Sequence, residues 1–289
     1  LRTTAQPPGA LADFSRLHRL GQQRIQALQL RGYAPGTAGT ATLEAITQDT
    51  RTWAPERRFR FRNALCFTGN DGWAQTPNGP VHWCQSTGVA LAIWVRLDAL
   101  PATEAYIAGH ETVTGTGWRL LVRADGTVKM RVAAPGLASE ATGATALAVG
   151  QWVHIVAHFG NFTASHFNLY INAVADTLAV VLNDDCSGVS PAGVFAIGQW
   201  PGNPAAPERL QARVTELIVA RTATPAWAAH LYAAGFGHFP PSPDGLLGYW
   251  PLSETQGTTA PPLWGPRPLV LTSFPAAQTT TGGGAWVGR

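Results

Sequence analysis

The feature that most constrains this chain is a series of short segments in which apolar and polar residues alternate, separated by turn residues. Alternation with a period of two is typical of half-buried β-strands. Asp125-Gly126 stands between the runs Trp118–Arg123 and Thr127–Val132 and is typical of a tight hairpin turn. Because no long helical pattern separates these segments, we expect an all-β fold, a two-sheet antiparallel jelly-roll sandwich.

The expected strands share this alternation or are short apolar runs bounded by turn residues. Two helices are expected beside them, an amphipathic one over residues 11–30 and a short one that begins at Thr224-Pro225 and ends at Gly235. The expected strands are Thr40–Ile46, Arg57–Arg62, Asn63–Thr68, Gly88–Leu97, Ala105–His110, Trp118–Arg123, Thr127–Val132, Trp152–Phe159, Phe167–Ile171, Gly193–Ile197, Ala212–Ala220 and Gly248–Leu252.

The pattern divides the chain into three parts. Residues 1–56 form an arm with the amphipathic helix and a short strand, residues 57–236 form the sandwich, and residues 237–289 are rich in Pro, Gly and Thr. The helical arm packs either on its own domain or on a partner subunit. We expect the C-terminal segment to pack back on the sandwich or on a neighbour.

Composition excludes several classes of protein. Charged residues are only 13% of the chain, whereas it contains 31 Gly and 22 Pro, which argues against a disordered chain and against a helical bundle. The net charge is +3 without a long Lys/Arg run, so nucleic acid is not an expected partner. No apolar run is long enough to span a bilayer. The three cysteines, Cys66, Cys84 and Cys186, leave the redox compartment undecided.

An ordered set of motifs resembles the laminin-G-like modules of the concanavalin A-like lectin/glucanase superfamily. The segment Gln151-Trp-Val-His-Ile-Val-Ala157 is similar to the family's "gqWhHvA" strand and is the most distinctive piece. The other matching pieces are Asn63–Trp73, Val89–Arg96, Gly117–Gly126, Phe167–Asn172, Ala212–Ala220, Pro225–Gly235 and Gly245–Glu254. The resemblance implies a concanavalin A-like sandwich over about residues 60–255.

The resemblance also implies a calcium ion at the rim of the sandwich, and calcium is the one cofactor that we consider. Here Asn70 and Asp71 keep part of the family's first calcium loop. In the second element Thr215 replaces the family's aspartate, with Glu216 beside it. A calcium site usually needs six to eight oxygen ligands with several carboxylates. The candidate metal ligands are therefore Asn70, Asp71 and Glu216.

Some relatives in this superfamily are retaining glycosidases, which need two carboxylates about 5–5.5 Å apart. This chain lacks the family's cluster of acids on alternate residues of one strand. It also lacks a Gly-x-Ser-x-Gly motif, HExxH and a P-loop. We therefore expect a protein that is not an enzyme.

Ligand binding is expected at aromatic residues near turns, because a flat ring beside polar groups suits stacking on a sugar. The equally open alternative is that these rings cap the sandwich or meet a neighbouring subunit. The candidate rings are Trp73, Trp83, Trp118 and Trp200, with His110, Glu111 and Asn203 as polar companions.

Two functions follow. The first is a non-catalytic recognition or attachment module that binds a glycan or protein through its rim loops. The second is a structural subunit of a large assembly such as a virion, in which residues 1–39 and the C-terminal segment dock on other subunits. Both place the protein outside the cell, at a cell surface or on a virion. A glycoside hydrolase is the third and weakest hypothesis.

Overall fold

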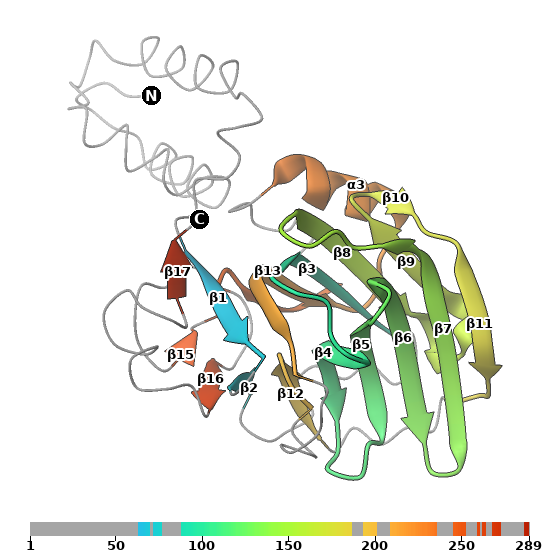
Figure 1. Ribbon diagram of the computed structural model, residues 1–289. Coiled ribbons are helices and arrows are strands. Elements are labelled where there is room, and N and C mark those ends of the chain that lie inside the picture. Colours follow the sequence, from blue (N-terminus) through green and yellow to red (C-terminus); the bar gives the residue numbers. More distant parts are fainter. Residues whose placement is uncertain are drawn as a thin grey trace, which may run out of the picture. The chain divides into compact units, whose positions relative to one another are not determined.

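The computed structural model describes a sandwich of two antiparallel β-sheets (Figure 1). The all-β sandwich predicted from the sequence is confirmed. The helix expected over residues 11–30 and the strands expected at 40–46 and 57–62 lie outside the described residues. Those residues are 63–69, 72–76, 88–186, 193–200, 209–235, 245–252, 259–260, 262–263, 268–272 and 286–288.

The first sheet, sheet A, has the strand order β10-β9-β8-β3-β13-β1-β17, and β14 also pairs with β13. Its longest strand, β13, carries β1 along its first half and β14 along its second half, on the same edge. The strands are β1 (Asn63–Thr68), β3 (Val89–Leu97), β8 (Trp152–Phe159), β9 (Phe167–Ile171), β10 (Val174–Ala175), β13 (Gln211–Ala220), β14 (Leu246–Trp250) and β17 (Trp286–Gly288).

The second sheet, sheet B, has the order β11-β7-β6-β5-β4-β12-β2-β16-β15. Its centre is a run of sequential hairpins from β4 to β7, so neighbours in sequence are neighbours in space. The strands are β2 (Trp73–Gln75), β4 (Glu104–Glu111), β5 (Gly117–Arg123), β6 (Thr127–Ala134), β7 (Leu137–Ala146), β11 (Leu178–Asn183), β12 (Val194–Ile197), β15 (Thr259–Ala260) and β16 (Leu269–Thr272).

The main core lies between the two sheets. Alternate residues of β8, Val153, Ile155 and Ala157, face the core, as the period of two in this strand predicts. Trp118 and Leu120 of β5 meet them from sheet B. Each such large apolar side chain stabilises the fold by about 1.5–3 kcal/mol through removal from water.

Helix α3 (Pro225–Ala234) packs on the outer face of sheet A. The Trp227 backbone N–H donates to Thr224 Oγ1 at 3.2 Å, and Gly235 has φ +68°, so the predicted N-cap and stop are confirmed. Ala90 and Ala92 of β3 are small enough to let Ala228 and Leu231 of the helix approach the sheet. None of the described helices has both the length and the apolar character that a membrane crossing requires.

The sequence pattern missed β7 and β11. In β7 the core-facing positions are the small residues Ser139, Ala141 and Gly143, which give no hydrophobic alternation. In β11 the run Leu178–Leu182 is apolar throughout, so no period is visible. The C-terminal segment supplies β14, β15, β16 and β17, and therefore takes part in both sheets.

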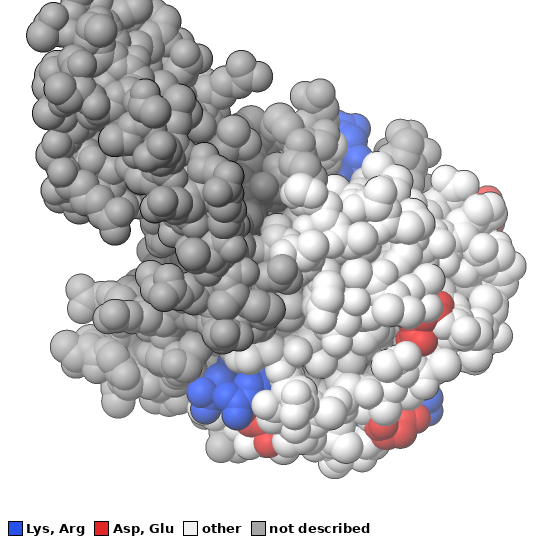
Figure 2. Space-filling model, turned by 90° about the horizontal axis from the view of Figure 1, so that it is seen from above, with Lys and Arg blue, Asp and Glu red and all other residues white. Residues whose placement is uncertain are grey.

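Charged side chains gather in a few small clusters on the described part of the face shown in Figure 2, and wide areas between them are uncharged. This matches the low charged fraction of the chain. The described thiols, Cys66 and Cys186, are free. Burial raises the pKa of both thiols, which disfavours the reactive thiolate.

Candidate functional site

The outer face of sheet B gathers aromatic side chains from strands that are distant in sequence. Trp73 of β2 and Trp200, which follows β12, pack on a small cluster formed by Tyr106, Leu121 and Ala196. Both tryptophans are half-buried, so part of each ring faces solvent. The Trp73 indole N–H donates to Gln75 Oε1 at 2.8 Å, which orients that ring. Two of the predicted ligand-binding rings therefore lie on one face of one sheet.

Trp200 reaches this face because the chain turns sharply after β12. Gly198 has φ +88°, a conformation that favours glycine, and a Cβ at this position would lie only 2.2 Å from the Phe67 ring. Beyond the turn, Trp200 lies over the β4–β5 hairpin, where a Cβ on Gly115 would be 3.4 Å from its ring. The Arg119 guanidinium carbon lies 5.6 Å from the centre of the Trp200 ring, a cation–π contact.

A buried ion pair lies beneath Trp200. Arg119 Nε is 3.7 Å from Glu111 Oε1, and the two side chains are only 9% and 1% exposed. Removing one partner of a buried pair leaves an uncompensated charge and costs about 3–5 kcal/mol. The pair therefore supports the ring above it and presents little surface of its own to a ligand.

Four further charged residues continue across the same face as a ladder. Lys129 Nζ on β6 lies 3.0 Å from Glu104 Oε1 on β4 and 2.8 Å from Glu140 Oε1 on β7. Arg131 Nε on β6 lies 3.8 Å from Glu140 Oε2. The outer face of sheet B thus has aromatic side chains on one part and pairs of opposite charges on another.

Two predicted site residues face the core instead of solvent. His110 and Trp118 stand opposite each other on β4 and β5, and both side chains are 0% exposed. Trp118 packs against Phe159 and Phe195. The strand alternation turns both side chains inward, so neither is on the solvent-facing side where the sequence placed a ligand. Trp83 and Asn203 lie outside the described residues.

Glu216 lies on β13, away from the end of β1 that precedes the predicted calcium loop. Glu216 sits in a bulge of β13 with φ +53°, five residues beyond Gln211, which pairs with Thr68 at the end of β1. Its carboxylate is 4% exposed and accepts a hydrogen bond from the Tyr249 hydroxyl at 2.5 Å. Burial raises the pKa of Tyr249 well above its usual value, and the Glu216 carboxylate adds to this. Glu216 therefore does not fit a rim calcium site.

The other two candidate calcium ligands, Asn70 and Asp71, lie outside the described residues. Within the described part of the chain, no group of three His, Cys, Asp or Glu side chains is placed to hold a metal ion. Calcium binding thus stays a prediction from the sequence.

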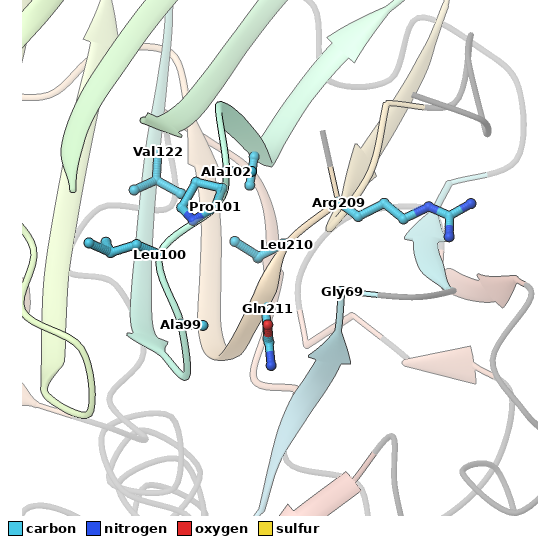
Figure 3. A pocket seen from close by; sticks show the side chains of 10 residues that line it. Gly69, Ala99, Leu100, Pro101, Ala102, Val122, Arg209, Leu210 and Gln211 are labelled. Carbon is cyan, nitrogen blue, oxygen red and sulfur yellow. The ribbon is translucent and has the colours of Figure 1, made fainter. Parts of the chain in front are cut away.

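A cavity of about 190 Å³ lies between the β3–β4 connection and residues 209–211 (Figure 3). Leu100 and Pro101 of the β3–β4 connection line one side, and Leu210 lines the other. The Arg209 side chain extends away from Pro101 and Leu210 in Figure 3. Of the predicted site residues that the structure describes, none lines this cavity, and we assign no function to it.

Sequence reasoning missed the pairing of Glu111 with Arg119 and the charge ladder. The signal was present as alternation in β6, where Lys129 and Arg131 occupy every second position between core residues. Which carboxylates face them depends on strand order and register, and neither is visible in one sequence.

Fold and face together define a lectin-like β-sandwich with an aromatic and polar sheet face. The chain belongs to the concanavalin A-like lectin/glucanases superfamily, whose family model Laminin_G_3 matches residues 68–225. The laminin-G-like resemblance seen in the sequence is confirmed. The comparison with curated proteins finds no match.

Solved structures with a similar fold have low sequence identity. A protein of Bacteroides ovatus, named a candidate carbohydrate-binding protein, is 16% identical with a TM-score of 0.54, over 73% of this chain and 58% of that one. This chain thus spans little more than half the length of that protein. A heptameric SAP-like pentraxin from Limulus polyphemus is 14% identical with a TM-score of 0.45, over 62% of this chain and 85% of that one.

Domain 4 of AbnA, a GH43 extracellular arabinanase from Geobacillus stearothermophilus, was solved in complex with arabinotriose. It is 18% identical with a TM-score of 0.42, over 58% of this chain and 75% of that one. These likenesses concern the fold.

Proposed function

We propose that this protein is a non-catalytic recognition module that binds a glycan on the outer face of sheet B. The observation that carries the proposal is the pair of half-buried tryptophans, Trp73 and Trp200, on one sheet face, with Arg119 against the Trp200 ring. The name of the Bacteroides ovatus protein agrees with this proposal.

The face has the physical properties that sugar recognition requires. A sugar ring offers an apolar face of C–H groups for stacking and a rim of hydroxyls for hydrogen bonds. Trp73 and Trp200 supply exposed ring surface, and Gln75 supplies an amide next to Trp73. Because Gln75 orients Trp73 and Arg119 packs against Trp200, little side-chain freedom is lost when a ligand binds.

The charges on this face do not favour glycosidase chemistry. Glu104 and Glu140 lie on either side of Lys129, with one oxygen of each carboxylate 3.0 and 2.8 Å from its ammonium group. These ion pairs engage carboxylates that an acid and a nucleophile would otherwise present to a glycosidic bond. The carboxylate of Glu111 is 1% exposed beneath Trp200 and Arg119. We therefore propose binding without hydrolysis.

Removing the two rings tests the proposal. The variants Trp73→Ala and Trp200→Ala should each weaken glycan binding about fivefold or more, since a stacked aromatic contributes on the order of 1 kcal/mol. Binding is measured on a glycan array and then by calorimetry with the strongest hit. Trp227→Ala is the matched control, because Trp227 is equally half-buried but packs with the cluster under α3.

A folded wild-type protein that binds no glycan would contradict the proposal, as would equal losses in Trp227→Ala and the two test variants. The alternative role, a structural subunit with docking arms, would then become the leading hypothesis.

A further inference from the structure

All four basic side chains of β5 and β6 are already matched by carboxylates. Each has a carboxylate oxygen within 4 Å of its nitrogen, so this face carries both signs of charge in close pairs. The pairs are Arg119–Glu111 at 3.7 Å, Arg123–Asp125 at 3.4 Å, Lys129–Glu104 at 3.0 Å, Lys129–Glu140 at 2.8 Å and Arg131–Glu140 at 3.8 Å.

The pairing is closest at Lys129, which is the only lysine of the chain. Its side chain is 13% exposed and lies between Glu104 and Glu140, so an approaching anion meets two carboxylates beside the ammonium group. Arg119 is covered by Trp200 and is similarly shielded.

An anionic sugar therefore finds little unmatched positive charge here. A carboxylate, sulfate or phosphate group binds tightly when it meets Arg or Lys in a bidentate or charge-assisted hydrogen bond. On this face such an anionic group would have to displace a carboxylate that already pairs with the cation, or lie beside it. Like charges in contact oppose binding. A neutral sugar meets no such penalty, because hydroxyls both donate to carboxylates and accept from cations.

We propose that the outer face of sheet B selects neutral glycans and discriminates against glycans that carry carboxylate, sulfate or phosphate groups. The proposal rests on the glycan-binding function proposed above and adds the chemical class of the ligand. The matched charges act as the specificity filter, and the tryptophans supply the stacking.

The test uses paired probes, an array in which each neutral oligosaccharide is printed beside its sialylated and sulfated forms. The wild-type protein should bind the neutral member at least about tenfold more tightly than either anionic member, a difference on the order of 1.4 kcal/mol. Its binding should change little with ionic strength, because no net ion pair forms with the ligand.

Glu140→Gln is the decisive variant. It removes the carboxylate that faces Arg131 and one of the two that face Lys129, so it should increase binding to the anionic probes several-fold, and added salt should abolish the gain. Asp98→Asn is the matched control. It makes the same change of charge and exposes Arg213, 3.4 Å from Asp98, on sheet A, so it should not increase anionic binding.

Failure of the neutral preference and failure of glycan binding give different results. A wild-type protein that binds sialylated or sulfated probes as well as the neutral ones overturns the neutral preference but keeps glycan binding. The preference is also overturned if Glu140→Gln melts like the wild type and gains no anionic binding, or if Asp98→Asn gains as much. A blank array overturns the glycan-binding function and this inference with it.

Discussion

At the scale of single residues, His154 shows how packing changes the chemistry of a side chain. It lies on the outer face of sheet A beside Trp94 and Tyr232, with ring centres 5.0 and 6.1 Å away. Its side chain is 2% exposed, and burial lowers the pKa of His154 from 6.5 to about 3. This buried, ring-packed environment favours a structural role for His154.

The depressed pKa of His154 predicts a loss of stability in acid. The unfolded chain binds a proton near pH 6.5, whereas the folded chain resists protonation until about pH 3. The His154 contribution is therefore fully present above pH 6.5, and the free energy of unfolding falls as the pH is lowered from 6.5 towards 3. The steepest slope from this group is about 1.4 kcal/mol per pH unit.

Chemical denaturation between pH 7 and pH 4 measures this slope. In His154→Phe the ring packing is kept and the titrating group is removed, so the slope should be smaller than in the wild type. Equal slopes in the two proteins would show that His154 is not the source. Carboxylates that titrate in this range affect both proteins equally, so the difference between the two slopes reports on His154 alone.

At the scale of the element, β11 is an edge strand with an unusual surface. It ends sheet B, and Val180, Val181 and Leu182 are 48%, 61% and 46% exposed. A register shift between Val180 and Leu182 disrupts its pairing with β7. Such a bulge is one of the ways in which proteins make an edge strand less able to pair with another chain.

We predict that the folded protein self-associates through this strand when it is heated or concentrated. Val181→Lys should raise the concentration at which light scattering detects aggregates, because a charge on an edge strand opposes strand pairing. The free energy of unfolding should change by about 0.5 kcal/mol or less, since the side chain is exposed. Val149→Lys, at an exposed turn residue with no part in a sheet edge, is the control. A similar effect from both lysines would point to net charge instead of the edge.

At the scale of the whole molecule, the chain divides into two compact units. One contains residues 1–60 with 234–241, and the other contains residues 61–233 with 242–289. The first described strand of the sandwich, β1, begins at Asn63. The described C-terminal strands belong to the second unit, where β14 pairs with β13 and β16 pairs with β2.

Deleting residues 1–39 tests what the N-terminal part does. Because the described sheets begin at Asn63, we expect the melting temperature of the sandwich to stay within a few degrees, about the shift that 1 kcal/mol would cause. Glycan binding should persist. Sedimentation velocity then shows whether assembly depends on the arm: loss of oligomers with unchanged melting supports docking on neighbours. A large fall in melting temperature would contradict the expectation and make the arm part of the core.

The amino-acid sequence by itself determined the local features of this protein. The alternation in β8, the Asp125-Gly126 hairpin and the Thr224 cap depend on neighbours within a few residues, so one sequence was enough to predict them. The ordered motifs then identified the family. Only the tertiary structure decided which predicted rings share a face, because that depends on strand order and register. It turned Trp118 inward, folded Trp200 back over Arg119, and placed Glu104 and Glu140 on either side of Lys129.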